Sequence, residues 1–140
     1  MNIEEILKRS KKIVITTHQS PDGDAIGSSL ALFGYLVKKG FDVSVVVPDS
    51  FPKFLKWMEG ADDIHVYDYE ENAVKGLISE ADLIFSLDYN DLTRVGGVGH
   101  LIEKSTAYKA MIDHHLHPSD FADWMCSDTS SCSTAQLIYN

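Results

Sequence analysis

The sequence predicts an α/β fold: an open, mainly parallel sheet flanked by helices on both faces. Short β-branched runs alternate with segments of helical periodicity, which is typical of parallel strands joined by helices. Three of these runs, KIVITT, DVSVVV and DLIFSL, have the apolar content expected of buried strands. A length of 140 residues suits one domain, residues 1–140, with a substantial core.

Each expected element is bounded by local signals. Gly40 is a stop signal for the long helix before it, and Pro52 occupies the first turn of the next helix. The expected strands are residues 12–17, 42–47, 64–67, 82–87, 108–112 and, at an edge of the sheet, 124–127. The expected helices are residues 3–9, 25–39, 51–58, 71–79 and a last one that starts at 134.

The chain is acidic, with 21 Asp and Glu residues, 12 Lys and Arg residues and a net charge of −9. This argues against a broad basic surface for long duplex nucleic acid, although bound metal ions would still allow short oligonucleotides or nucleotides. No apolar run approaches the roughly 20 residues of a membrane span, and no signal-peptide segment is present. Two cysteines are too few for a disulfide scaffold, so a cytoplasmic protein without a membrane partner is expected.

Metal-binding side chains follow three of the expected strands. In an open parallel sheet, ligands bind beyond the carboxyl ends of the strands, where the strand order changes direction. Separate segments can therefore converge on one crevice. The candidates are His18, Asp22 and Asp24 after the first strand, Asp88 after residues 82–87, and Asp113, His114 and His115 after residues 108–112.

The residue types restrict the chemistry of this crevice. Carboxylates and imidazoles without a thiolate suit Mn²⁺, Mg²⁺, Fe²⁺ or Zn²⁺. Two such ions about 4 Å apart need a bridging carboxylate, and they clamp the attacking and leaving oxygens of an in-line phosphoryl displacement. Asp88 is the candidate bridge, because it stands alone at the tip of a central strand.

The segment HQSPDGDAIGSS has a physical interpretation of its own. Its proline fixes a turn, and Gly23 lets two aspartates point to the same side of a tight loop. Gly27 and Ser28 are expected to open the following helix, whose first N–H groups favour anions. Taken alone, the segment also fits an ordinary turn with Asp24 as a helix N-cap. Its combination with Asp88 and the DHH run favours a functional site.

Three motifs in order, HQSPDGDAIGSSLAL, SLDYND and IDHH, resemble the first three motifs of the DHH phosphoesterases. This family includes RecJ-type exonucleases, manganese-dependent inorganic pyrophosphatases and the nanoRNA/pAp phosphatases of the NrnA type. The resemblance extends over essentially the whole chain. The segment SSCSTAQLIYN is similar to one in the nanoRNase/pAp subgroup, which makes that branch the preferred one.

The resemblance implies a role for each metal-binding candidate. His18 and Asp22 would bind the first of two divalent ions, with Mn²⁺ as the preferred metal. Asp24 and His114 would bind the second ion, and Asp88 would bridge the two.

The same resemblance implies the catalytic roles and the substrate. His115 would contact a substrate phosphate, and Asp113 would orient an imidazole from behind it. A water acidified by both ions would attack phosphorus directly. The implied substrates are short single-stranded oligoribonucleotides (nanoRNA) and 3′-phosphoadenosine 5′-phosphate (pAp).

Three other functions compete with this interpretation. The rival within the family is a manganese-dependent inorganic pyrophosphatase or exopolyphosphatase, and the rival outside the enzymes is a non-catalytic metal- or nucleotide-binding module. A haloacid-dehalogenase-like phosphatase is rejected, because its nucleophilic aspartate directly follows a strand. Asp22 instead lies five residues past Thr17.

The chain also departs from the family pattern. Full-length relatives carry a later aspartate that completes the second metal site, and a C-terminal substrate-binding domain called DHHA1. Neither has room in 140 residues, so a domain truncated at its C-terminal end, weakly active or inactive alone, is expected. The family also suggests a homodimer through the helical face. Arg94 and His117 fit either a site role or solvated turns.

Overall fold

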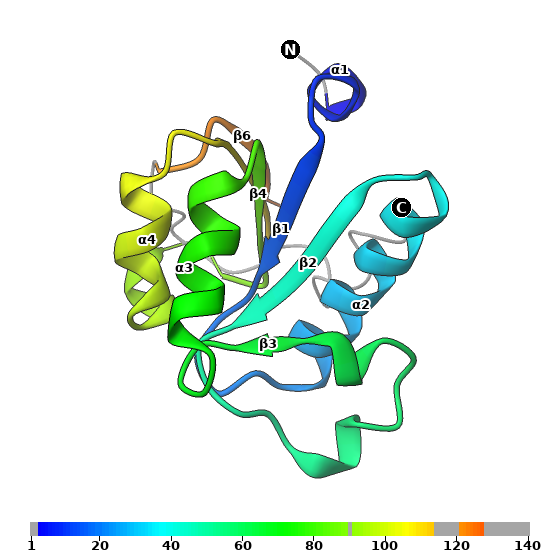
Figure 1. The fold of residues 1–140 in the computed structure, drawn as a ribbon. Coiled ribbons are helices and arrows are strands. Elements are labelled where there is room, and N and C mark those ends of the chain that lie inside the picture. Colours follow the sequence, from blue (N-terminus) through cyan, green and yellow to red (C-terminus); the bar gives the residue numbers. More distant parts are fainter. Residues whose placement is uncertain (1–2, 90, 114–120, 128–140) are drawn as a thin grey trace.

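The computed structural model describes residues 3–89, 91–113 and 121–127, and it confirms the predicted fold class. Six strands form one sheet in the order β3-β2-β1-β4-β5-β6, and every pair of neighbours is parallel (Figure 1). The strands are β1 (Lys12–Thr16), β2 (Asp42–Val47), β3 (His65–Val66), β4 (Leu83–Leu87), β5 (Tyr108–Asp113) and β6 (Trp124–Ser127). The helices are α1 (Ile3–Lys8), α2 (Gly23–Lys38), α3 (Glu71–Glu80) and α4 (Val98–Lys104).

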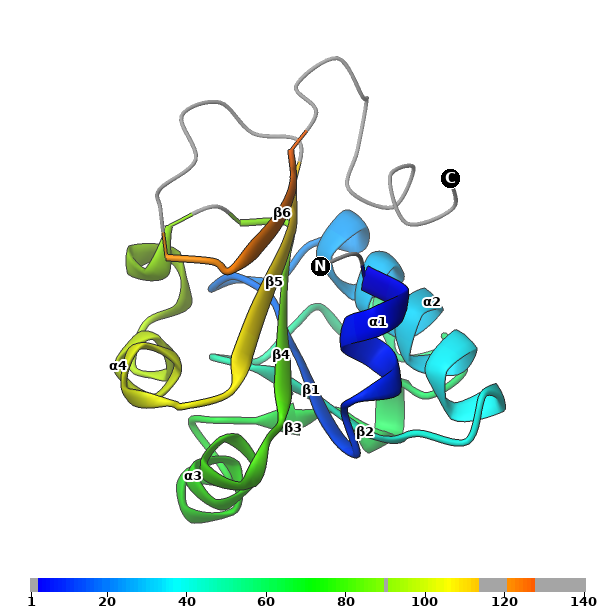
Figure 2. The ribbon, with the colours of Figure 1, turned by 90° about the horizontal axis from the view of Figure 1, so that it is seen from above.

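The helices cover both faces of the sheet, as predicted. Figure 2 shows α1 and α2 on one side of the strands and α3 and α4 on the other. Successive side chains of a strand point to opposite faces. In β1, Ile13 and Ile15 accordingly pack in the cluster under α1 and α2, whereas Val14 packs in the cluster under α3 and α4. The central strands are therefore buried on both faces, which accounts for their continuous apolar runs.

The long helix α2 begins earlier than expected, at Gly23. Its N-cap is Asp22, whose Oδ1 accepts a hydrogen bond of 2.9 Å from the Ala25 backbone N–H. The expectation that Gly27 opens this helix is therefore wrong, and so is the alternative interpretation in which Asp24 is its N-cap. The helix ends as predicted, because Gly40 takes a left-handed conformation with φ of +90°.

The expected helix over 51–58 is wrong. The segment contains a single 3₁₀ turn, Lys53–Leu55, and a second such turn follows at Ala61–Asp63. Phe51 and Leu55 pack in the core, whereas Phe54 and Trp57 are 72% and 78% exposed. The segment is short and its three aromatic residues have only modest helix propensity, so burial of one face does not suffice for a full helix.

The helix α4 and the 3₁₀ turn Leu92–Val95 before it were not predicted. The three glycines around them indicated an irregular turn, yet Gly97 is the N-cap of α4 and Gly99 lies inside it. A Cβ at Gly99 would lie 2.6 Å from the Leu92 carbonyl oxygen. This glycine therefore allows the helix to pack directly against the preceding turn.

The remaining strand and helix expectations agree with the structure to within about two residues, the uncertainty usual for element ends. The helix expected from 134 lies outside the described residues. Among the helices that the structure describes, none is both long and apolar enough to cross a membrane.

The glycine contact at α4 gives a test of this packing. We expect Gly99→Ala to lower the free energy of unfolding by about 1–3 kcal/mol, because the added methyl group must displace backbone. Gly76→Ala is the matched control, since it lies inside α3 with no atom within 4 Å of its Cβ position. The control should gain about 0.5–1 kcal/mol from helix propensity. Equal effects in urea unfolding would contradict the close approach.

Candidate metal centre

The site lies where the chain connections leave the sheet in opposite directions. From β1 the chain passes through α2 to β2, and from β4 it passes through α4 to β5, on the other side. Since β1 and β4 are neighbours, this is the switch point at which the topology predicts a ligand crevice beyond their carboxyl ends. His18 follows β1 by two residues, Asp88 directly follows β4, and Asp22 caps α2.

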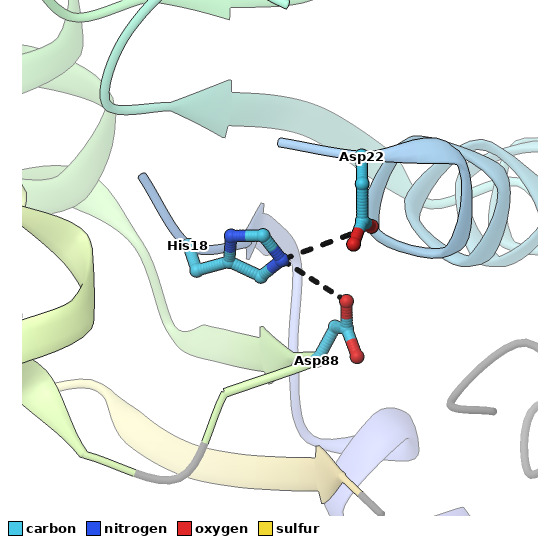
Figure 3. A group of neighbouring side chains, drawn as sticks. All are labelled: His18, Asp22 and Asp88. Atoms are coloured by element: carbon cyan, nitrogen blue, oxygen red, sulfur yellow. Dashed lines mark hydrogen bonds and ion pairs between the residues drawn. The ribbon is translucent and has the colours of Figure 1, made fainter. Parts of the chain in front are cut away.

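Three side chains from these segments converge in the crevice (Figure 3). His18 Nε2 lies 3.1 Å from Asp88 Oδ2 and 3.8 Å from Asp22 Oδ1. One ligand atom from each of the three residues lies within 4.8 Å of the other two. His18 and Asp88 are buried, while the Asp22 side chain is 65% exposed. Two of the three side chains are therefore buried in the core, and the third faces solvent.

The orientation of the His18 ring is set by its own loop. His18 Nδ1 lies 2.6 Å from the Gln19 carbonyl oxygen, so this nitrogen carries a proton and donates it. The other nitrogen, Nε2, then faces the two carboxylates. The hydrogen bond to Asp88 raises the pKa of His18 above 6.5, against the opposing effect of burial. The Gln19 carbonyl and the Asp22 carboxylate also raise this pKa.

Asp88 has an unusual backbone conformation. Its φ is +63°, in the left-handed region that Asp and Asn visit more readily than other residues with a side chain. Its N–H still donates to the Ile112 carbonyl oxygen of β5 at 3.1 Å. The strand thus ends in an abrupt turn that directs the carboxylate at His18.

Further hydrogen bonds hold the loop that carries His18 and Asp22. The Thr17 hydroxyl donates to the Leu87 carbonyl oxygen at 2.8 Å, which joins the residues just before His18 and Asp88. The Gln19 N–H donates to the Arg94 carbonyl oxygen at 2.7 Å. The Ser20 N–H donates to Asp49 Oδ1 at 2.7 Å.

A small polar network lies directly under the site. The Thr16 hydroxyl donates to the Phe85 carbonyl oxygen and lies 2.7 Å from the hydroxyl of Tyr89. That tyrosine hydroxyl donates to Ser86 Oγ at 2.7 Å. Tyr89 is fully buried, which raises its pKa to about 12, and its ring stacks on Phe121.

The sequence pattern did not single out Gln19, Asp49 or Tyr89. Asp49 follows β2, so it lies at the same carboxyl edge as the other candidates and the strand-end rule could have found it. Gln19 contributes through backbone hydrogen bonds, and a sequence pattern of side chains cannot predict these. Tyr89 was passed over because a tyrosine beside a motif is ordinarily core.

Two sequence candidates that the structure describes lie outside the group of three. Asp24 is half-buried in the first turn of α2, and Asp113 is fully buried at the end of β5. Neither belongs to the metal-type group found among the described residues. His114 and His115 lie outside the described part of the chain, as does His117. Arg94 is exposed.

The three converging residues fit a divalent metal ion. Bond lengths near 2.1 Å place neighbouring ligands of an octahedral ion about 3.0 Å apart, close to the 3.1 Å between His18 and Asp88. The separation of 3.8 Å to Asp22 needs only a small rotation of an exposed side chain. Imidazole and carboxylate ligands suit Mn²⁺, Mg²⁺, Fe²⁺ or Zn²⁺.

Curated relatives cover nearly the whole chain. The bifunctional oligoribonuclease and PAP phosphatase NrnA of Thermus thermophilus is 32% identical over 137 residues, which are 97% of this chain and 38% of that protein. A probable NrnA of Streptococcus mutans is 25% identical over 132 residues, or 94% of this chain and 38% of that protein. The chain thus spans about two fifths of the length of these relatives.

Solved structures and a family profile agree with this likeness. An exopolyphosphatase-related protein from Bacteroides fragilis has a TM-score of 0.96 and 45% identity, over 97% of this chain and 40% of that one. RecJ from Thermus thermophilus in complex with Mn²⁺ has a TM-score of 0.56 and 14% identity, over 97% of this chain and 18% of that one, a likeness of fold alone. Residues 12–140 match the DHH family, N-terminal domain, and the chain belongs to this family of phosphoesterases.

Proposed function

We propose that this chain is the catalytic domain of a metal-dependent phosphoesterase that hydrolyses short oligoribonucleotides, pAp or both. The observation that supports it most is the convergence of His18, Asp22 and Asp88 at the crevice between β1 and β4. The Thermus relative, named as an oligoribonuclease and PAP phosphatase, supports the choice of substrates. Since the chain spans about two fifths of that relative, binding of metal is the most direct test of the chain itself.

Five residues are proposed as ligands of two divalent ions, with Mn²⁺ as the preferred metal. His18 and Asp22 would hold the first ion, Asp24 and His114 the second, and Asp88 both. The carboxylate of Asp88 is buried and lies 3.1 Å from His18, which supports the proposal that it binds both ions. RecJ, which shares the fold, was solved with Mn²⁺.

The protein groups would prepare the site for an anionic substrate. When bound, the two ions supply positive charge for a phosphate and acidify a water for attack on phosphorus. The bond from His18 Nδ1 to Gln19 keeps Nε2 turned to the ion position, which spares the site a reorganisation. His115 is proposed to contact the substrate phosphate, and Asp113 to orient an imidazole.

A second candidate function is cleavage of P–O–P bonds, as in an exopolyphosphatase or inorganic pyrophosphatase. The exopolyphosphatase-related protein from Bacteroides fragilis, at 45% identity, favours it. Both candidates use the same metal site, so they differ only in the substrate. A non-catalytic metal- or nucleotide-binding module is the third outcome to be distinguished.

The substrate is tested on the full-length gene product by phosphate or nucleotide release in the presence of Mn²⁺. We expect turnover of pAp and of a 5′-phosphorylated RNA dinucleotide, and none of pyrophosphate or polyphosphate. Turnover of pyrophosphate or polyphosphate alone would favour the second candidate function. Mn²⁺ and nucleotide binding without any turnover would favour the binding module.

The metal site is tested by Asp88→Asn. We expect this variant to lose Mn²⁺ binding by at least about tenfold, because it removes a buried anionic ligand. Asp68→Asn is the matched control, since Asp68 is exposed and lies outside the group of three. Free Mn²⁺ measured by electron paramagnetic resonance reports the affinity. Equal affinities of the two variants would remove Asp88 from the site.

The raised pKa of His18 predicts opposite pH trends with and without metal. In the metal-free protein, protonated His18 adds stability that is complete below pH 6.5 and is lost as the pH rises through its raised pKa. Binding of Mn²⁺ requires the unprotonated ring, so the stabilisation by Mn²⁺ grows over the same pH range.

Thermal unfolding with EDTA and with Mn²⁺, from about pH 5 to 8, measures both trends. His18→Gln should abolish both. His100→Gln, which changes an exposed histidine, should keep both. If either pH trend persists in His18→Gln, a titrating group other than His18 causes it.

A further inference from the structure

Tyr89 contacts both segments that carry His18 and Asp88. It directly follows Asp88, and its hydroxyl lies 2.7 Å from Thr16 Oγ1, two residues before His18. Its ring stacks on Phe121, with ring centres 6.1 Å apart and an angle of 4° between the planes.

Tyr89 lies in a loop, yet its side chain is held by several contacts. The side chain is fully buried, and its hydroxyl has two partners, Thr16 and Ser86, each at 2.7 Å. The Thr16 hydroxyl is in turn fixed by the Phe85 carbonyl oxygen at 2.7 Å. Rotation of the tyrosine ring would therefore break buried hydrogen bonds to both β1 and β4, which is costly.

The backbone at Asp88 needs such an anchor. A left-handed residue that is not glycine costs of order 1–3 kcal/mol and persists only where its surroundings enforce it. The Asp88 N–H bond to Ile112 holds the residue on one side, and the buried ring of Tyr89 holds the next residue. Together they determine the direction in which the Asp88 carboxylate leaves the strand.

We propose that Tyr89 is a positioning residue that aligns the segments of His18 and Asp88, and so sets the affinity of the site for a divalent ion. The inference rests on the proposed metal site. Tyr89 does not touch the ion or the substrate, and it acts through Asp88 and Thr16. Its hydroxyl fixes the distance between β1 and β4 at the crevice, and its ring is held in place by Phe121.

The test compares two tyrosine variants that each lose one hydroxyl. Tyr89→Phe keeps the ring on Phe121 and removes the bonds to Thr16 and Ser86. Tyr108→Phe is the matched control, because its hydroxyl also donates a bond, to the Asp123 carbonyl oxygen at 3.3 Å. Tyr108 begins β5 and thus lies at the opposite edge of the sheet from the crevice.

Three quantities are measured for each variant and for Asp88→Asn: Mn²⁺ affinity, the urea unfolding midpoint, and the NMR signals of the His18 ring without metal. We expect Tyr89→Phe to weaken Mn²⁺ binding by about 10- to 100-fold, the range seen when a partner of a ligand is removed. The His18 signals should shift in Tyr89→Phe and stay unchanged in Tyr108→Phe.

The outcomes separate this inference from the proposed function. If Asp88→Asn loses Mn²⁺ while Tyr89→Phe binds it like the unchanged protein, the metal site stands and the positioning role is wrong. A lower unfolding midpoint in Tyr89→Phe with unchanged affinity and unchanged His18 signals would make Tyr89 merely structural. Failure of the unchanged protein to bind Mn²⁺ would overturn both.

Discussion

The site depends on the parallel pairing of β1 with β4. This pair brings together two segments about 70 residues apart in the sequence, and the bond between His18 and Asp88 spans the same separation. The pairing also marks where the connections diverge, through α2 to one side and α4 to the other. A crevice with apolar strands behind it follows from that topology, before any metal or substrate is considered. The acidic residues at the crevice therefore need no dedicated scaffold, because the sheet that forms the core also positions them.

Much of this arrangement was accessible from the sequence. Buried strands have continuous apolar runs, so the ends of β1 and β4 were located closely, and His18 and Asp88 with them. The resemblance to DHH motifs supplied the roles that residue types alone leave open. What the sequence could not provide depends on contacts between distant segments. The helix α4 was not predicted because it contains glycines that serve its packing against the turn before it, and residues 51–58 form only a 3₁₀ turn although Phe51 and Leu55 are buried.

The site also shows why a pattern of side chains gives an incomplete description of a metal centre. His18 is oriented by a backbone carbonyl, and the loop behind it is held by another carbonyl, that of Arg94. The cap that starts α2 and the candidate ligand are the same residue, Asp22, so the beginning of a helix and the composition of the site are set together. Local composition alone also suited Asp24 as the cap. The actual start is decided by which carboxylate reaches the Ala25 N–H.

The left-handed turn at Asp88 has a consequence for how this position can vary during evolution. Glutamate would keep the negative charge, yet it is disfavoured in this backbone conformation, and the same holds for most residues with a longer or branched side chain. Glycine and asparagine suit the conformation but lack the charge. Aspartate is thus the one residue type that satisfies both the geometry of the chain and the chemistry of an anionic ligand. Both the backbone conformation and the binding of metal would therefore select for aspartate at this position.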